Sequence, residues 1–212
     1  MLFKSYMHKK FPNLELRQPL YYSWKNAIRF ELGIEELRDY EADSLYLTEV
    51  YKRAITLFDS VNQCNDEIFV VANISDYGYG ITSRHKLNVF LKYIKQKDVL
   101  NKLNHTIIPY VYPEDDDEGD CKTHRFILKC KVSDIKYLSM IKAICNQDMG
   151  VKPSINHEIF FINIKKETIF IIYDDRGCDI LASSRESLYN IYKEYNGWIL
   201  DYDRKEIDSI FS

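Results

Sequence analysis

The chain has 212 residues, of which 46% are hydrophobic and 29% charged, and its formal net charge at pH 7 is −3. A chain of this length can bury one sizeable core, and its 17 Tyr and 11 Phe argue against disorder, because disordered chains are poor in aromatic residues. The weak negative charge gives no global basic field to hold a nucleic-acid backbone. We therefore expect one folded domain, residues 1–212, that binds no nucleic acid.

The cysteines are five in number, widely spaced and without a C-x-x-C pair, so they indicate neither a disulfide framework nor a zinc knuckle. They are Cys64, Cys121, Cys130, Cys145 and Cys178. Residues 1–10 alternate apolar and basic side chains and do not resemble a signal peptide, and no segment approaches the ~18 apolar residues of a membrane span. We expect reduced, mostly buried thiols in a cytoplasmic protein with no membrane contact and no cofactor.

The first half of the chain predicts two strands around a long helix. Residues 13–23 suggest extended chain, and residues 24–32 alternate with a period of two, which predicts a half-buried strand closed by Gly33. Apolar residues at three- and four-residue steps predict a helix over about 43–62. Residues 66–75 are rich in Val and Ile and predict a buried strand.

The middle of the chain is interrupted by loops. Residues 76–80 (D-Y-G-Y-G) indicate a loop rather than a phosphate cradle, and Ser83 is placed to cap a helix over about 84–94. Strands are predicted over 106–112, stopped by Pro113, and over 122–132. Ser133 then opens a predicted helix that continues to about Asn146.

The C-terminal third predicts a three-stranded meander over residues 158–164, 168–173 and 178–182, followed by two helices. Ser183 with Glu186 has the pattern of a capping box, and Asp203 with Glu206 repeats it. Since helices and hairpins do not alternate as βαβ units, the pattern favours an α+β fold, a mostly antiparallel sheet with helices packed on one face. The acidic run at 114–120 is the only break in composition along the sequence, so a boundary between two subdomains, if present, is expected there.

The most conspicuous polar cluster follows the second strand of the meander. Asp174 and Asp175 could bind a cation such as Mg²⁺, with Asp179 and Arg176 orienting a phosphate or carboxylate. The alternative is structural, because D-D-R-G between two strands suits a tight hairpin, with Gly177 as the left-handed residue of a bulge. The sequence favours the turn.

A second cluster surrounds the first predicted strand, where alternation places Arg29 and Glu31 on one face next to Trp24. Asp201, Asp203 and Arg204 become neighbours if the terminal segment returns across the sheet. A solvated ion pair is the common explanation of such residues, worth ~0–1 kcal/mol. A functional face is the alternative.

Recognised catalytic spacings are missing from the sequence. The histidines (His8, His85, His105, His124 and His157) show no H-x-x-x-H or H-E-x-x-H, and there is no P-loop, G-x-G-x-x-G or G-x-S-x-G. The sequence therefore predicts no metal bound by histidine.

The acidic run places six carboxylates in seven residues, which cannot be buried together. They are Glu114, Asp115, Asp116, Asp117, Glu118 and Asp120. The run suits a solvated loop best. It also allows nucleic-acid mimicry, in which carboxylates block the basic groove of a nuclease, whereas the ligand pattern of an EF-hand is absent.

Four phrases together resemble one family. They are Phe11-Pro12, Trp24 followed by Arg29-Phe-Glu-Leu-Gly33, Tyr173-Asp-Asp-Arg-Gly-x-Asp179, and Trp198-Ile-Leu-Asp-x-Asp-Arg204. This pattern, from about residue 11 to 212, is similar to an uncharacterised domain family of Gram-positive bacteria known only as a domain of unknown function. The resemblance implies no activity, so no catalytic residue follows from it.

Two functions fit these observations. The first is a non-enzymatic intracellular module that binds another protein, for example an immunity protein or toxin antagonist. It would use Trp24, Arg29 and the acidic run. The second is a small metal-assisted hydrolase of the phosphoesterase type, built on Asp174, Asp175, Arg176 and Asp179 with Glu31. Convergence of these carboxylates on one pocket would favour the enzyme.

Overall fold

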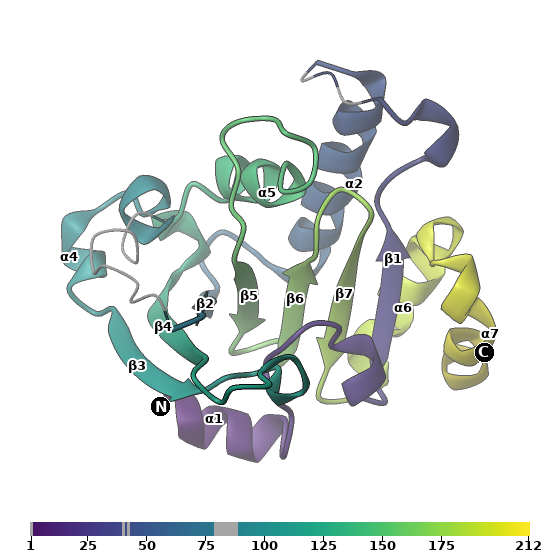
Figure 1. Cartoon of the computed structure of the whole chain (residues 1–212). Helices are drawn as coiled ribbons and strands as arrows, with labels where there is room; N and C mark the ends of the chain where they lie inside the picture. Colours follow the sequence, from purple (N-terminus) through teal and green to yellow (C-terminus); the bar gives the residue numbers. More distant parts are fainter. Residues whose placement is uncertain (1, 40, 42, 79–88) are drawn as a thin grey trace.

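A single antiparallel sheet organises the computed structural model, which describes residues 2–39, 41, 43–78 and 89–212. Within these residues the strands are β1 (Ala27–Glu31), β2 (Glu67–Asp76), β3 (Asn104–Pro109), β4 (Lys122–Lys131), β5 (Glu158–Asn163), β6 (Thr168–Ile172) and β7 (Gly177–Ala182). They lie in the order β1-β7-β6-β5-β2-β4-β3, and every neighbouring pair is antiparallel. The predicted α+β class, the antiparallel sheet and the C-terminal meander are confirmed (Figure 1).

The helices are α1 (Phe3–Lys10), α2 (Leu45–Val61), α4 (Lys97–Leu100), α5 (Tyr137–Cys145), α6 (Glu186–Glu194) and α7 (Asp201–Phe211). Residues 89–93 are also helical, but Ser83 and the predicted start of that helix lie outside the described residues. The helix predicted from Ser133 begins only at Tyr137, after a 3-10 turn over Val132–Asp134. None of the described helices is long and apolar enough to cross a bilayer.

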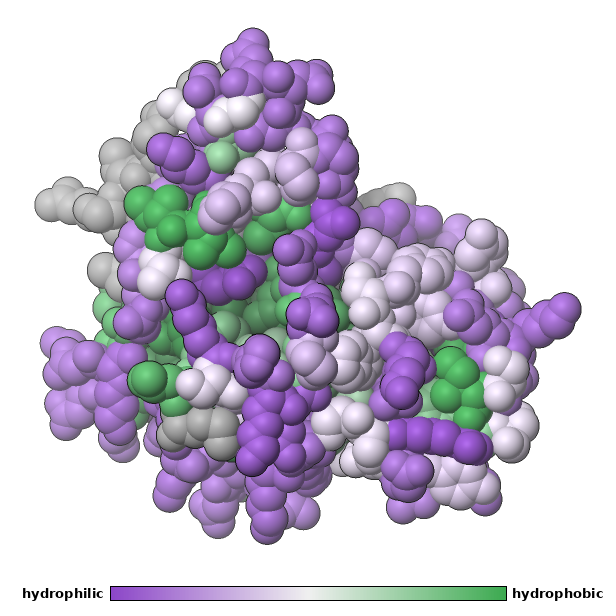
Figure 2. Space-filling model, turned by 90° about the horizontal axis from the view of Figure 1, so that it is seen from below, coloured by the Kyte–Doolittle hydropathy of each residue, from purple (hydrophilic) through white to green (hydrophobic). Residues whose placement is uncertain are grey.

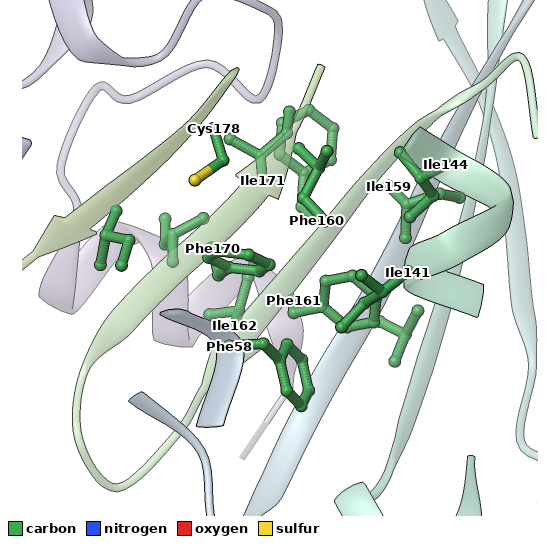
Figure 3. Close-up of a cluster of buried hydrophobic side chains, with 14 of the residues drawn as sticks. Phe58, Ile141, Ile144, Ile159, Phe160, Phe161, Ile162, Phe170, Ile171 and Cys178 are labelled. Carbon is green, nitrogen blue, oxygen red and sulfur yellow. The ribbon is translucent and has the colours of Figure 1, made fainter. Parts of the chain in front are cut away.

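Helices α2 and α5 cover one face of the sheet, as predicted, and bury its aromatic core. Phe58 of α2 is fully buried, and its ring contacts Phe161 edge-on at 5.1 Å and Phe170 at 5.7 Å. Tyr137 of α5 stacks on Phe58 at 4.9 Å. Figure 3 shows Phe58 directed at the side chains of β5 and β6. The apolar stripe read from the sequence therefore becomes the contact between helix and sheet.

The opposite face is covered by α1, which the sequence analysis did not predict. Phe3 and Tyr6 contact the ring of Phe69 at 5.4 and 5.7 Å. Phe69 pairs in register with Ile162, next to Phe161, and neighbouring residues of a strand point to opposite faces. The prediction of helices on one face thus holds for α2 and α5 but not for α1.

The chain after α1 crosses this second face as an irregular segment. Asn73 of β2 donates a hydrogen bond to the carbonyl of Leu16 at 2.7 Å, and the backbone N–H of Tyr21 donates to Asp179 of β7 at 2.8 Å. A 3-10 turn, Tyr21–Ser23, leads into β1. Side chains from β2 and β7 therefore hold the segment that was predicted to be simply extended.

Both predicted capping boxes are wrong. The Ser183 hydroxyl donates to Glu167 at 2.6 Å, and α6 has no side-chain cap. Asp203 lies within the first turn of α7, where it accepts hydrogen bonds from Tyr22 and Arg29. In both places the side chain that the local pattern assigned to capping a helix is hydrogen-bonded instead to a residue that is distant in sequence.

The prediction of mostly buried thiols holds for three of the five cysteines. Cys130, Cys145 and Cys178 are buried, Cys121 is half-buried and Cys64 is exposed, all as free thiols. Burial raises the pKa of Cys130 to about 12, so that thiol is protonated at neutral pH.

Candidate functional site

The candidate site is centred on Arg29, whose guanidinium lies between two buried carboxylates. Its Nε is 3.2 Å from Oδ1 of Asp179, and its Nη1 is 3.3 Å from Oδ2 of Asp203. The side chain of Arg29 is 12% exposed, that of Asp203 4%, and Asp179 is fully buried. One cation therefore compensates two carboxylates that have little access to water.

The fold brings these residues together from distant parts of the chain. Arg29 and Asp179 are register partners on β1 and β7, so their side chains leave the sheet on the same face. The C-terminal chain returns along β1 through an isolated bridge between Phe30 and Ile199, which places the first turn of α7 above Arg29. The network thus joins three of the phrases that carry the family resemblance.

Three tyrosines complete the cluster. Nη2 of Arg29 donates to the hydroxyl of Tyr173 at 3.2 Å, and Nη1 donates to that of Tyr22 at 3.2 Å. The Tyr22 hydroxyl in turn donates to Oδ1 of Asp203 at 3.1 Å. The guanidinium also lies over the rings of Tyr21, Tyr22 and Tyr173 at 5.2, 4.7 and 5.4 Å, a favourable cation–π arrangement.

The surroundings of Arg29 keep its guanidinium charged. Burial alone would lower the pKa of Arg29, but the Asp179 carboxylate and Tyr173 outweigh it and raise that pKa above its ordinary value. Burial raises the pKa of Asp179, and Arg29 and its hydrogen bonds oppose the rise. Burial, followed by the negative charge of Asp179, raises the pKa of Tyr173. The tyrosine therefore stays protonated at neutral pH.

This geometry suits a scaffold better than a catalyst. Asp179 accepts from Arg29, from the Tyr21 N–H and from Tyr173, so its oxygens are already engaged. Arg29 uses Nε, Nη1 and Nη2 within the network. What the cluster does present to solvent is Tyr22, which is 57% exposed while its hydroxyl and ring are both held.

The remaining residues of the predicted second cluster have other roles. Trp24 donates its indole N–H to the carbonyl of Ala182 at 2.7 Å. Arg204 ion-pairs with Asp201 at 2.9 Å and donates to the carbonyl of Ile199 at 3.0 Å. These contacts secure chain segments and do not reach Arg29.

Glu31 shares a strand face with Arg29 but not its network. It lies at the exposed end of β1, where Arg53 donates to its backbone carbonyl at 3.1 Å. Partial desolvation raises the pKa of its carboxyl group, and the charge of Arg53 opposes the rise.

The D-D-R-G phrase is a turn between β6 and β7. Asp174 accepts from the backbone N–H of Arg176 at 2.7 Å and also ion-pairs with its guanidinium. Gly177 does not have a positive φ, so the predicted left-handed bulge is wrong. A Cβ at this position would make a tight contact, 3.0 Å, with the carbonyl oxygen of Phe30, so glycine fits here without displacing the backbone of β1.

Asp175 points to the α2 face, opposite to Asp179. It is almost fully buried and accepts a 2.5 Å hydrogen bond from the hydroxyl of Tyr46 in α2. Its other oxygen, Oδ1, has no hydrogen-bond partner among the described residues. Gly33 makes room for Tyr46, since a Cβ on Gly33 would lie 2.4 Å from that hydroxyl.

Gly33→Ala is therefore expected to destabilise the protein by about 1–3 kcal/mol, the usual cost of overpacking. The new methyl group displaces Tyr46 from Asp175, and urea unfolding measures the loss. Tyr46→Phe provides the control, because it removes the clashing oxygen and the hydrogen bond together. In the Tyr46→Phe background, Gly33→Ala should lower the free energy of unfolding by clearly less than in the wild type. If the effects of the two substitutions were strictly additive, the contact between position 33 and Tyr46 would not explain the loss.

The carboxylates proposed for a hydrolase do not converge. Asp175 and Asp179 lie on opposite faces of the sheet, Asp174 is engaged in the turn, and Glu31 lies at the end of β1. Across residues 2–39, 41, 43–78 and 89–212 no group of three or more His, Cys, Asp or Glu could hold a metal ion. The geometry gives the metal-assisted mechanism no support.

The acidic run is the loop between β3 and β4, which pair with each other, so the sheet continues across it. Glu114 ion-pairs with Arg17 at 2.7 Å, and Asp116 accepts from the backbone N–H of Cys121. Four carboxylates are exposed and make no ion pair within the described part of the chain. These are Asp115, Asp117, Glu118 and Asp120.

A histidine pair is the feature that sequence spacing missed. Nε2 of His105 lies 2.9 Å from Nδ1 of His124, whose Nε2 is 3.2 Å from Asp76. The two histidines are 19 residues apart and meet only because β3 and β4 are neighbours. A separation of 19 residues lies outside the H-x-x-x-H and H-E-x-x-H spacings.

Comparison with known proteins agrees with the family resemblance that the four sequence phrases indicated. The model of the family described as "Domain of unknown function (DUF3885)" matches residues 3–203. The chain is also 32% identical over 206 residues to "Uncharacterized protein YnaE" of Bacillus subtilis (strain 168), covering 93% of this chain and 96% of that protein. No solved structure gives a significant match. The chain belongs to the DUF3885 family, as the resemblance in its sequence predicted.

Proposed function

We propose that this protein is a non-enzymatic module that binds another protein through the surface around Tyr22. One observation carries the proposal: Tyr22 is 57% exposed, yet its side chain is held in place. Its hydroxyl is hydrogen-bonded to Asp203 and Arg29, and the guanidinium of Arg29 also lies over its ring. An aromatic side chain that is ordered before binding loses little conformational entropy on contact. Tyrosines of this kind are enriched among the residues that dominate binding energies.

The surroundings of Tyr22 suit a contact surface. Tyr202, which precedes Asp203 in α7, is 85% exposed. Both tyrosines line a shallow depression together with Asp203, Lys205 and Glu206. Apolar ring area beside mixed charges is the composition of many interface centres and rims.

The finer proposal is that the partner is a basic toxin and that this protein is its immunity protein. The four exposed carboxylates of the acidic run support it, because clustered charge accelerates the approach of an oppositely charged partner and selects against others. The run is then a steering element, and the Tyr22 surface provides the contact.

The test uses a photo-crosslinking amino acid, p-benzoylphenylalanine, at position 202 of the full chain in a lysate of the native host. The control carries it at Leu45, which is 74% exposed at the start of α2. A partner crosslinked from position 202 and not from 45 supports the proposal. Equal products from both positions, or none from either, contradict it.

The partner identified in this way then allows a direct measurement. Tyr22→Ala should weaken its binding by about 30-fold, the effect of a 2 kcal/mol hot-spot residue. Tyr22→Phe keeps the ring but loses the bond to Asp203, and its effect should be intermediate. For a toxin partner, co-expression of the wild-type chain should restore growth and Tyr22→Ala should do so less well.

A further inference from the structure

A groove with an apolar floor lies between α1 and the β2-β4-β3 end of the sheet. Its floor is formed by Phe3 of α1, Phe69 of β2, Ile108 of β3 and Ile127 of β4, and Leu2, 80% exposed, stands at its edge. The volume is about 600 Å³, within the range of binding pockets. Figure 2, seen from below, shows hydrophobic surface in a hollow surrounded by hydrophilic residues.

The polar lining of this groove carries only one sign of charge. Lys4, Lys102, Arg125 and Lys129 line it, and no Asp or Glu is among the lining residues. Lys129 ion-pairs with Glu67 at 3.0 Å outside the groove, and Arg125 donates to Asn73 and to the carbonyl of Leu16. Lys4 and Lys102 form no ion pair within residues 2–39, 41, 43–78 and 89–212. In a chain of net charge −3, this is a local positive field.

We infer that this groove binds an amphipathic segment of a partner protein that carries acidic residues beside its apolar face. Helices recognised in grooves insert apolar residues at i, i+3, i+4 and i+7, which matches the apolar floor. The cations come from α1, from the turn after α4 and from β4. Cations at separate positions can pair with several carboxylates along a peptide. A fatty acid has a single carboxylate and would need these cations gathered at one point.

The inference rests on the proposed protein-binding function, because it names the chemistry of a partner segment. It uses a surface distinct from Tyr22, so the two can fail separately. If position 202 crosslinks a partner and the groove binds no acidic segment, only the inference fails. If position 202 crosslinks nothing and the groove does bind, only the Tyr22 surface fails.

The experiment measures fluorescence anisotropy with a labelled, acetylated 18-residue peptide that has Leu and Phe at i, i+3, i+4 and i+7 and Glu at the flanking positions. The full chain is expected to bind it, with an affinity that falls as salt concentration rises. Lys4→Glu combined with Lys102→Glu should weaken binding about tenfold or more, because two attractions become repulsions. Circular dichroism checks that this variant folds.

The matched control is Lys136→Glu combined with Lys152→Glu, which makes the same change in net charge at exposed lysines outside the groove. That variant should bind the peptide within about twofold of the wild type, an effect of long-range charge alone. Equal losses in both variants would overturn the inference, since binding would then depend on net charge and not on the groove.

Two further probes separate other occupants. A peptide with Ser in place of Leu and Phe should not bind, and equal binding would overturn the role of the apolar floor. Displacement of the acidic peptide by dodecanoate at equimolar ratio would assign the groove to acyl chains and also overturn the inference. Absence of any peptide binding would do the same.

Discussion

Arg29→Ala is expected to lower the free energy of unfolding by about 3–5 kcal/mol, the effect of removing one partner of a buried ion pair. Asp179, fully buried, and Asp203, 4% exposed, would both lose their cation. Asp179 would keep only the hydrogen bonds from the Tyr21 N–H and from Tyr173. Urea unfolding at pH 8, followed by circular dichroism, measures the loss.

The loss should depend on pH in a defined direction. Burial already raises the pKa of Asp179 and Arg29 lowers it, so removal of Arg29 raises it further. A carboxyl group with a raised pKa in the folded state binds its proton more tightly there than in the unfolded chain. Stability then falls as pH rises from the unfolded pKa, about 3.9, through the folded pKa. The deficit of Arg29→Ala should therefore be smaller at pH 5 than at pH 8.

A charge-matched variant provides the control for Arg29. Arg29→Met combined with Asp179→Asn removes the cation together with the more deeply buried of its two carboxylates, and it should be more stable than Arg29→Ala. A deficit below about 1 kcal/mol for Arg29→Ala would contradict the buried network, because that is the value of a solvated surface pair.

Phe58→Ala is expected to cost about 3–5 kcal/mol, the usual range for removing a buried aromatic side chain. The ring is fully buried and contacts Tyr137, Phe161 and Phe170, so one substitution opens a cavity between α2, α5 and the sheet (Figure 3). Thermal unfolding of the variant and the wild type measures the shift in Tm.

Phe58→Leu separates packing from hydrophobicity. It keeps an apolar side chain, and we expect a loss of about 1.5 kcal/mol or less, as for hydrophobic replacements of similar volume. If Phe58→Ala and Phe58→Leu had the same effect, the aromatic contacts would contribute little and the packing account of this face would be wrong.

Elements with a strong local pattern could be predicted from the sequence. The apolar stripe of α2 and the apolar runs of β2, β5, β6 and β7 predicted the first and last residues of these elements to within about two residues. Helix α1 was missed, since its eight residues carry four basic side chains and its N-cap has no side-chain hydrogen bond. Its stability depends on the contact with Phe69, which no local pattern contains.

The candidate site was predicted only in pieces. Arg29 and Asp203 were grouped together and Asp179 was assigned to a separate cluster, although the Nε of Arg29 is 3.2 Å from Asp179. That contact needs the register of β1 against β7, set by strands 150 residues apart in the chain. Tyr22, which completes the network, carried no signal beyond being aromatic, and Tyr173 entered the sequence analysis only as part of a family phrase.

The sequence by itself determined the α+β class, the antiparallel meander and the family of this protein, because periodicity and short phrases are local properties of the chain. Only the tertiary structure decided which charged residues meet. It placed Asp175 against Tyr46 on one face of the sheet and Asp179 against Arg29 on the other. The physical reason is that a strand alternates its side chains between two faces, so the chemistry of each residue depends on what the fold packs against that face.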